Sequence, residues 1–261
     1  MAATELRLPT ESDDKYSRGV LGFATGSVAF PGAAMLGIDA ALSTGIGMVR
    51  YVGEDSVANA VVARRPEVVK GPGRVSAWVV GSGMVAVDDD AMLWARAALS
   101  EGITAIVDAG ALSLLPIHPR VIATPHAGEL ATALRITRSD VEADPAALAL
   151  RAAIQWDVTV VLKGSTTYIV NPLGDAFSVN LAPAWLAIAG AGDTLAGIIG
   201  ALAATRSDDI AESGHALARI AAAGVVVHSV AAARASGGGP FLLADLVKHI
   251  PGVIRDLALQ S

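Results

Sequence analysis

A single carboxylate stands where a glycine turn runs into an apolar helix. In Gly190-Ala-Gly-Asp193, small residues lead into Asp193, and no further charge follows before Arg206. A turn that opens a helix directs unpaired backbone N–H groups and the positive end of the helix dipole at one point, which suits a phosphate or a developing anion. Asp193 would face that point and could take a proton from a substrate hydroxyl. The alternative is that Asp193 only caps the helix.

Lys163 is the second residue with an unusual setting. It is one of four lysines in a chain with fifteen arginines, and it follows an apolar stretch, 158–162, that is expected to be a strand. Gly164-Ser-Thr-Thr167 comes next, with hydroxyls and N–H groups able to surround a phosphate. The alternative is a lysine at a strand end whose ammonium group reaches solvent.

Further polar or glycine-rich turns follow other expected strands: Gly26–Gly32, Gly81–Gly83, Asp108 and Pro125-His-Ala-Gly-Glu129. Asp108 could hold a metal-bound water, although a loop cap is the simpler interpretation. His126 and Glu129 could form an acid–base pair or bind a metal, but two such residues make a poor metal site. Contact between His126 and a substrate therefore remains open.

The elements that must position these residues alternate between strand and helix. Helices are expected over 31–42, 54–63, 88–100, 146–155, 193–204, 211–233 and 242–257, and strands over 19–25, 45–51, 66–70, 77–80, 103–107, 121–124 and 158–162, with a hairpin over 168–179. Open α/β sheets bind ligands at the carboxyl ends of their strands, where these turns lie. We expect an irregular leader over 1–18 and a single domain over 19–261.

Composition supports a covered parallel sheet. Of 261 residues, 53% are hydrophobic and only 17% are charged, so many strands must be buried on both faces. The net charge of −6 without a basic run argues against a nucleic-acid surface. The absence of cysteine excludes disulfides and thiolate metal sites. No targeting or membrane segment is recognisable, and we expect a cytoplasmic protein.

With these pieces in place, the sequence resembles the ADP/ATP-dependent NAD(P)H-hydrate dehydratases, members of the ribokinase-like superfamily. The resemblance covers roughly residues 15–257. The Thr124-Pro-His-Ala-Gly-Glu129 run together with Val161-Leu-Lys-Gly164 is specific, whereas the Gly-x-Gly-Asp turn marks only the superfamily. The other matching runs are Pro31-Gly-Ala-Ala-Met-Leu36, Gly45-Ile-Gly47, Gly81-Ser-Gly83, Asp108-Ala-Gly-Ala-Leu112 and Gly190-Ala-Gly-Asp193.

The resemblance implies a ribokinase-like fold and a repair reaction. Hydrated NADH or NADPH is phosphorylated on its hydroxyl at the expense of ADP, the nucleotide we favour, or of ATP, and phosphate is then eliminated. It implies Asp193 as the base, and it implies a divalent ion, Mg²⁺, with the nucleotide but without a dedicated ligand set. It also implies a homo-oligomer. The nucleotide-binding residues would be Lys163, Gly164, Ser165, Thr166, Thr167, Gly190, Ala191 and Gly192, and the hydrate would contact Ala33, Gly81, Gly83, His126 and Asp193.

The sequence departs from the family pattern before the catalytic turn. Where relatives usually have Asn-x-Thr-Gly-Asn, this chain has the apolar Asn180-Leu-Ala-Pro-Ala-Trp185, and Ala191 replaces a usual Ser or Thr. Two other functions therefore stay open. One is a ribokinase-like kinase of a small alcohol or vitamin precursor, which would not eliminate phosphate. The other is a nucleotide-binding module without catalysis.

Overall fold

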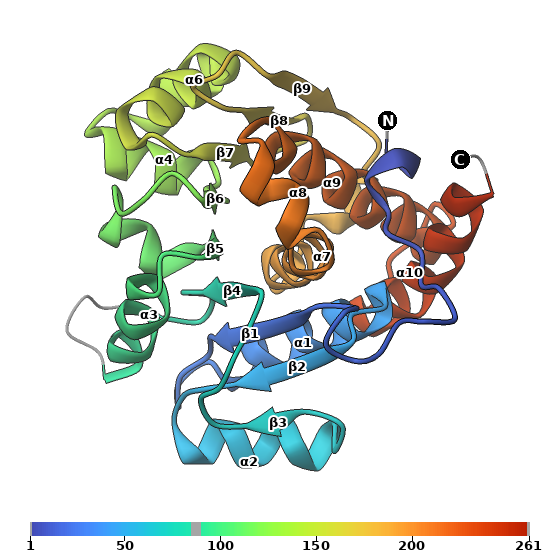
Figure 1. Cartoon of the computed structure of the whole chain (residues 1–261). Helices are drawn as coiled ribbons and strands as arrows, with labels where there is room; N and C mark the ends of the chain where they lie inside the picture. The colour runs from blue at the N-terminus through green and yellow to red at the C-terminus, as the bar shows by residue number, and fades with distance from the viewer. Residues whose placement is uncertain (1, 85–89, 260–261) are drawn as a thin grey trace.

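The computed structural model describes residues 2–84 and 90–259, in which nine strands form one sheet in the order β3-β2-β1-β4-β5-β6-β7-β8-β9 (Figure 1). Pairing from β3 to β7 is parallel, and β8 and β9 add an antiparallel hairpin. The strands are Val20–Ala24 (β1), Met48–Tyr51 (β2), Val69–Lys70 (β3), Ala77–Val80 (β4), Thr104–Val107 (β5), Val121–Ala123 (β6), Thr159–Leu162 (β7), Thr167–Val170 (β8) and Ala176–Val179 (β9).

Helices cover both faces of the sheet. In the described part of the chain they are Pro31–Thr44 (α1), Asp55–Arg64 (α2), Asp90–Ser100 (α3), Ala127–Leu134 (α4), Arg138–Ala143 (α5), Pro145–Trp156 (α6), Ala191–Thr205 (α7), Ser207–Glu212 (α8), His215–Ser236 (α9) and Leu243–Ala258 (α10). Helices α1, α2, α7, α9 and α10 share one core cluster with the sheet, and α3, α4 and α6 share the other.

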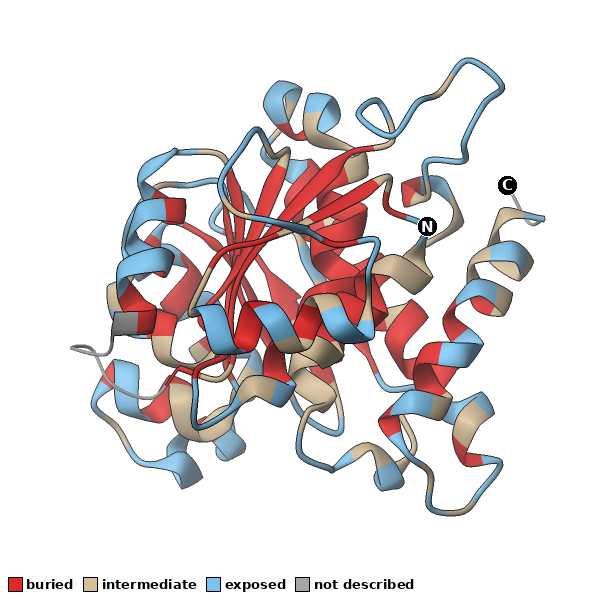
Figure 2. Ribbon diagram, turned by 90° about the horizontal axis from the view of Figure 1, so that it is seen from below, coloured by how far each residue is buried: buried red, intermediate tan, exposed pale blue. Residues whose placement is uncertain are grey.

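The strand sequences explain the two cores. In β5, Ile106 contributes to the core with α7, whereas its neighbours Ala105 and Val107 contribute to the core with α3. Successive strand side chains point to opposite faces, so a strand buried on both sides must be apolar throughout. Figure 2 shows most strands as buried, with the exposed residues on the outer sides of the helices.

The long apolar helix α9 belongs to the core. Its length and composition would allow it to cross a membrane, but 78% of its most apolar window is buried inside the molecule. Close packing requires small residues, since a Cβ on Gly224 would lie 2.6 Å from Cγ1 of Ile199 in α7. The segment Ile220–Ala233 therefore lies mostly in the core.

Several boundaries differ from those expected. The strand expected over 45–51 begins only at Met48, because Gly45 (φ +97°) ends α1 in a left-handed conformation. Helices α4, α5 and α8 were not expected, and the strand over 66–70 is reduced to an exposed pair at the sheet edge. Of the three aspartates expected in the first turn of the 88–100 helix, Asp88 and Asp89 lie outside the described residues.

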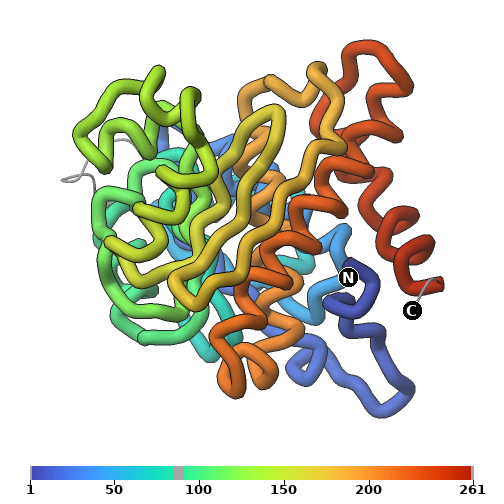
Figure 3. The backbone as a smooth tube through the Cα atoms, turned by 90° about the horizontal axis from the view of Figure 1, so that it is seen from above, coloured from blue at the N-terminus to red at the C-terminus, as the bar shows by residue number. Residues whose placement is uncertain are grey.

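Residues 2–18 are mostly irregular, apart from a short 3-10 helix, Ala3–Glu5 (η1). They are nevertheless held against the C-terminal helices (Figure 3). Arg206 donates a 2.7 Å hydrogen bond to the carbonyl oxygen of Thr4, and Nε of Arg219 lies 3.2 Å from Oε1 of the buried Glu5. Two arginines that are more than 200 residues away in the chain therefore fix this segment.

Candidate active site

Asp193 lies in the first turn of α7, at the carboxyl edge of the sheet. The N-cap of this helix is Gly190 (φ +91°), and no side chain makes the capping hydrogen bond. Asp193 is therefore not the helix cap. Glycine is required at 190 because a Cβ there would lie 2.4 Å from Cδ1 of Leu36. The first N–H of α7, that of Ala191, donates to the carbonyl oxygen of Ile188 at 3.3 Å, so the N–H groups that follow it are the ones available to an anion.

Lys163 lies beneath this turn instead of reaching solvent. Its N–H donates to the carbonyl oxygen of Pro125 at 2.8 Å, and its Nζ lies 2.7 Å from Oδ1 of Asp108 and 3.8 Å from Oε2 of Glu129. A Cβ on Gly192 would lie 3.2 Å from Nζ, so glycine lets the ammonium group approach the start of α7. The structure therefore brings Lys163 and Gly192 together, as expected for two residues of one site.

Asp108 is a buried partner of this ammonium group and does not cap its loop. The Thr124 hydroxyl donates to Oδ1 at 2.7 Å, and the Ser82 hydroxyl donates to Oδ2 at 3.0 Å. Burial alone would raise the pKa of Asp108, but Lys163 and the two hydroxyls outweigh it and hold the pKa below its ordinary value. Burial likewise opposes the charge of Lys163, whose pKa the carboxylates nevertheless raise. Both groups are therefore charged.

The same pair controls Asp193. Burial, followed by the negative charge of Asp108, raises the pKa of Asp193 from 3.8 to about 6, although the charge of Lys163 and the neighbouring Ser82 hydroxyl act in the opposite direction. A general base works best when its pKa lies near the working pH. A carboxylate with a raised pKa at a glycine turn is accordingly a candidate catalytic group.

Of the expected substrate residues, Ala33 and Gly83 meet beside Ser82, whereas Gly81 (φ +98°) packs against Asp108 and Ala111. A Cβ on Gly83 (φ +74°) would lie 2.7 Å from Cβ of Ala33, and the N–H of Gly26 donates to the carbonyl oxygen of Ser82 at 2.7 Å. One surface beside Asp193 is therefore formed by the turns after β1 and β4 and by the start of α1. Ser82 connects this surface to Asp193.

His126 begins α4 and forms a capping box with Glu129. Its Nδ1 accepts a 3.1 Å hydrogen bond from the N–H of Glu129, while its own N–H donates to Oε2 of Glu129 at 2.7 Å. The imidazole is 58% exposed, and a backbone bridge pairs His126 with Lys163. The ring is therefore held at the rim of the site, where a substrate could still contact it.

The expected phosphate loop is only partly open. Gly164 and Ser165 are exposed, but Thr167 is buried as the first residue of β8, and its hydroxyl donates to the carbonyl oxygen of Gly164 at 3.4 Å. Ser165 and Thr166 make no side-chain hydrogen bond to any described residue. Their hydroxyls, more than that of Thr167, suit the role expected from the sequence.

The residues do not provide a preformed metal site. No group of three or more His, Cys, Asp or Glu able to hold a metal occurs among the described residues. Both oxygens of Asp108 accept protein hydrogen bonds, and Oε2 of Glu129 accepts one from His126. A divalent ion here would need most of its ligands from a bound nucleotide and water, as Mg²⁺ often does.

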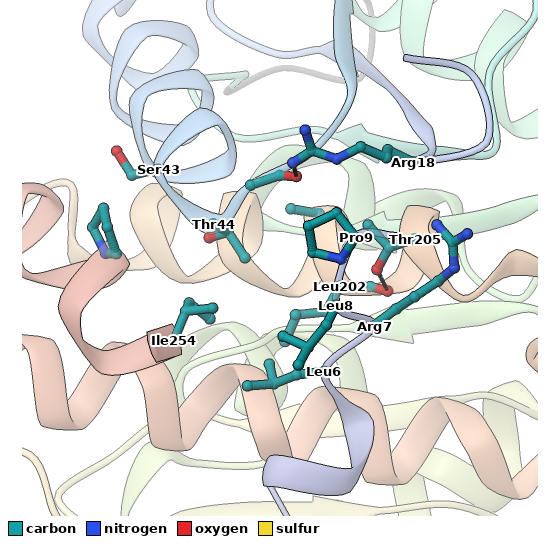
Figure 4. Close-up of a pocket in the computed structure, with 13 residues that line it drawn as sticks. Leu6, Arg7, Leu8, Pro9, Arg18, Ser43, Thr44, Leu202, Thr205 and Ile254 are labelled. Atoms are coloured by element: carbon teal, nitrogen blue, oxygen red, sulfur yellow. Dashed lines mark hydrogen bonds between the residues drawn. The ribbon is translucent and has the colours of Figure 1, made fainter. Parts of the chain in front are cut away.

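One cavity, of about 240 Å³, lies away from this site at the opposite end of α1 and α7 (Figure 4). Leu6, Leu8 and Pro9 of the N-terminal segment line it together with Thr44 and Thr205. None of the residues that the sequence assigns to the active site takes part.

The sequence did not indicate a role for Ser82 or Thr124, or the pairing of Asp108 with Lys163, although each of these residues follows a strand that was recognised.

The fold and the site together define a ribokinase-like α/β protein, and solved ribokinase-like structures share this fold. The family model of the NAD(P)H-hydrate dehydratases matches residues 21–251, and the chain belongs to this family. The fold and the family expected from the sequence are both confirmed.

Individual relatives also point to the NAD(P)H-hydrate dehydratase family. The chain is 39% identical over 212 residues to the bifunctional NAD(P)H-hydrate repair enzyme Nnr of Mycobacterium tuberculosis H37Rv, covering 76% of this chain and 43% of that protein. It thus spans about half or less of the bifunctional mycobacterial relatives. It is 32% identical to the ADP-dependent (S)-NAD(P)H-hydrate dehydratase of Xanthomonas campestris pv. campestris, covering 96% and 93%. A Bacillus subtilis ADP/ATP-dependent NAD(P)H-hydrate dehydratase, co-crystallised with ATP/Mg²⁺, superposes with a TM-score of 0.84 at 25% identity, covering 98% and 96%.

Proposed function

We propose that this chain catalyses the ADP-dependent dehydration of NAD(P)H hydrate, a repair of damaged nicotinamide nucleotides. Three observations support the proposal: the family, the names of relatives of similar length, and a buried carboxylate, Asp193, whose pKa is raised to about 6 beside a helix N-terminus. The last observation carries the chemistry, because the reaction begins with deprotonation of a hydroxyl.

The proposed first step is phosphorylation of the hydrate. Asp193 takes the proton of the hydroxyl, and the hydroxyl oxygen of the hydrate attacks the terminal phosphorus of ADP. The bond from that phosphorus to the oxygen of the leaving AMP breaks. The N–H groups of Gly190 and Gly192 would stabilise the charge on the transferring phosphoryl group, whereas that of Ala191 donates to the carbonyl oxygen of Ile188. Lys163 is close enough to Gly192 to neutralise a phosphate bound there.

The second step restores the dihydropyridine. Phosphate leaves with its bonding electrons, the ring double bond forms and the adjacent proton is released, so the net products are NAD(P)H, AMP, phosphate and a proton. We assign the nucleotide to Lys163–Thr167 with Gly190–Gly192, and the hydrate to Ala33, Gly81, Gly83, His126 and Asp193. When bound, Mg²⁺ would offset the charge of the nucleotide phosphates.

The test is incubation with NADH hydrate or NADPH hydrate and either ADP or ATP, following recovery of the reduced-nicotinamide absorbance and release of phosphate. Recovered absorbance with ADP is expected. A stable phosphoester without recovery would instead identify a kinase, and tight ADP binding without turnover of any hydrate would identify a binding module. A cytoplasmic location and a homo-oligomeric state complete the proposal, and light scattering tests the second of these.

A further inference from the structure

A second cavity, of about 410 Å³, opens at the same edge of the sheet as the candidate active site. It lies beyond the carboxyl ends of β2 and β3, where Tyr51 and Lys70 are the last strand residues. The start of α2 contributes Ala58, and Trp94 enters from α3, which packs on the other face of the sheet. Both helix layers therefore help to form this cavity.

The cavity lies along the same edge of the sheet as the surface beside Asp193. Three strand spacings separate β3 from β4 in the sheet order, a distance of about 14 Å. The intervening loops are bonded to one another: the Tyr51 hydroxyl donates to the carbonyl oxygen of Thr25 at 2.8 Å, and the next residue, Gly26, donates to that of Ser82. A ligand that extends from Ser82 along this edge would arrive at the cavity.

The lining suits an adenosine phosphate group. Trp94 is a large aromatic side chain, 39% exposed, and aromatic faces stack on nucleic-acid bases. Lys70 is the one basic residue among the described residues that line the cavity, which also include the carboxylates of Glu54 and Asp55. The Lys70 side chain is 40% exposed even though it contacts Asn59 and Asp55. At Gly71 (φ +89°), no atom lies within 4 Å of the position of a Cβ, so a ligand can approach the backbone.

The residues assigned to the hydrate surround its reacting ring, and the proposed substrate also has a second half. When the hydrated ring lies beside Asp193, the pyrophosphate, the second ribose and the adenine must extend away from it. We propose that the cavity beyond β2 and β3 binds this adenosine half, with the adenine against Trp94 and Lys70 facing the phosphates. The inference takes the identity of the substrate from the proposed function, and it adds the site that holds the non-reacting half.

ADP is the other adenine-bearing ligand, and the structure separates the two. Of the residues assigned to ADP, Lys163–Thr167 follow β7, which is separated from β2 and β3 by β1, β4, β5 and β6 in the sheet order. A role of Trp94 in binding the hydrate should therefore leave the KM for ADP unchanged.

The experiment compares a dinucleotide substrate with a truncated one. NADH hydrate and the hydrate of reduced nicotinamide mononucleotide, which lacks the adenosine half, are assayed with the parent, Trp94→Ala and Trp94→Phe. Leu93→Ala is the matched control, because Leu93 is a large exposed residue of the same helix that does not line the cavity. Melting temperatures show whether each variant remains folded.

Trp94→Ala is expected to lower kcat/KM for NADH hydrate by roughly 5- to 150-fold, the factor that corresponds to loss of one stacked base. The truncated hydrate should be turned over equally well by parent and variant. Trp94→Phe should retain most of the activity with NADH hydrate, and Leu93→Ala should resemble the parent. Equal losses with both substrates, or no loss with NADH hydrate, would refute the inference.

Binding of the product tests the cavity without requiring turnover. Calorimetric titration with NADH and with reduced nicotinamide mononucleotide should show weaker NADH binding in Trp94→Ala and no change for the mononucleotide. If the parent dehydrates no hydrate but this pattern holds, the proposed function fails and the cavity assignment stands. NADH binding that is unaffected in Trp94→Ala, or absent in the parent, rejects the assignment.

Discussion

The imidazole of His228 lies 3.0 Å, through Nε2, from the hydroxyl of Thr194, the residue directly after Asp193. The same hydroxyl donates its proton to the carbonyl oxygen of Ala191 at 2.8 Å, so Nε2 must carry the hydrogen that it shares with Thr194. Burial lowers the pKa of His228 to about 4, and the ring is therefore neutral at pH 7. A neutral histidine thus supports the first turn of α7 through its contact with Thr194.

This histidine predicts a loss of stability in acid. The unfolded chain binds the proton near pH 6.5 but the folded chain only near pH 4, so unfolding becomes more favourable as the pH falls between these values. His228→Gln retains a donor for Thr194 and removes the titrating group. Its melting temperature should fall less than that of the parent between pH 7 and pH 5. Asp193, whose pKa is raised, makes the folded state more favourable as the pH falls. This effect is the same in both proteins and cancels in the comparison. An identical decrease of the melting temperature in the parent and in His228→Gln would contradict the assignment of His228 as the titrating group.

Asp193→Asn should lower the turnover rate by about 10²–10⁴-fold, because asparagine cannot accept the hydroxyl proton. ADP affinity should remain near that of the parent, since the N–H groups of the turn are retained. The melting temperature at pH 7 should not fall, because a carboxyl group whose pKa is raised on folding costs stability when it is ionised. Parent-like turnover would remove Asp193 from the mechanism.

The pH profile should report the charge of Asp108. Because the base must be deprotonated, kcat/KM of the parent should rise with pH through about 6. Asp108→Asn removes a negative charge that raises the pKa of Asp193, so the midpoint should move from about 6 toward 3.8. The rate in the plateau can fall as well, because Lys163 loses its counter-charge, but only the midpoint tests the coupling. A midpoint that does not move would show that Asp108 does not influence the base.

Lys163→Ala should weaken ADP binding by about 1–3 kcal/mol, the range for hydrogen bonds to charged groups. The reason is the position of Nζ beneath Gly192, where a bound phosphate would meet the first N–H groups of α7. Calorimetry measures the affinity directly. Lys248→Ala is the matched control, because Lys248 is an exposed lysine on α10 paired only with Asp245. Unchanged ADP affinity in Lys163→Ala would exclude Lys163 from the nucleotide site.

Ala191→Ser restores the hydroxyl that relatives usually carry in this turn. Ala191 is the first residue of α7 and is only partly buried, so the serine has room for its oxygen. Turnover should stay within about twofold of the parent or rise, since one hydroxyl hydrogen bond contributes on the order of 1 kcal/mol. A large decrease in a well-folded variant would show that the turn geometry depends on alanine.

Much of this architecture is readable from the sequence because local patterns determine it. Apolar runs that end in glycine or a charged residue located β1, β4, β5 and β7, and the Gly190 turn located the start of α7. Helix α4 was missed because His126 and Glu129 were interpreted only as chemical groups, although their three-residue spacing also forms a capping box.

The charge relationships of the site could not be predicted in the same way. Asp108 and Lys163 are separated by 55 residues and by one intervening strand, β6, so only the assembled sheet brings them to 2.7 Å. The raised pKa of Asp193 follows from burial and from the negative charge of Asp108, while the charge of Lys163 opposes it. The sequence could therefore nominate the base, but not the two neighbours that tune it.

Because Glu5 lies between Arg206 and Arg219, the N-terminal segment matters more to the fold than its irregular backbone indicates. By secondary structure alone, residues 1–18 would be the first choice for trimming before crystallisation or for replacement by an affinity tag. Trimming would expose the floor of the cavity in Figure 4 and leave two arginines on the C-terminal helices without a shared acidic partner. An irregular segment can thus be part of the folded unit when its few side chains close the surface of other elements.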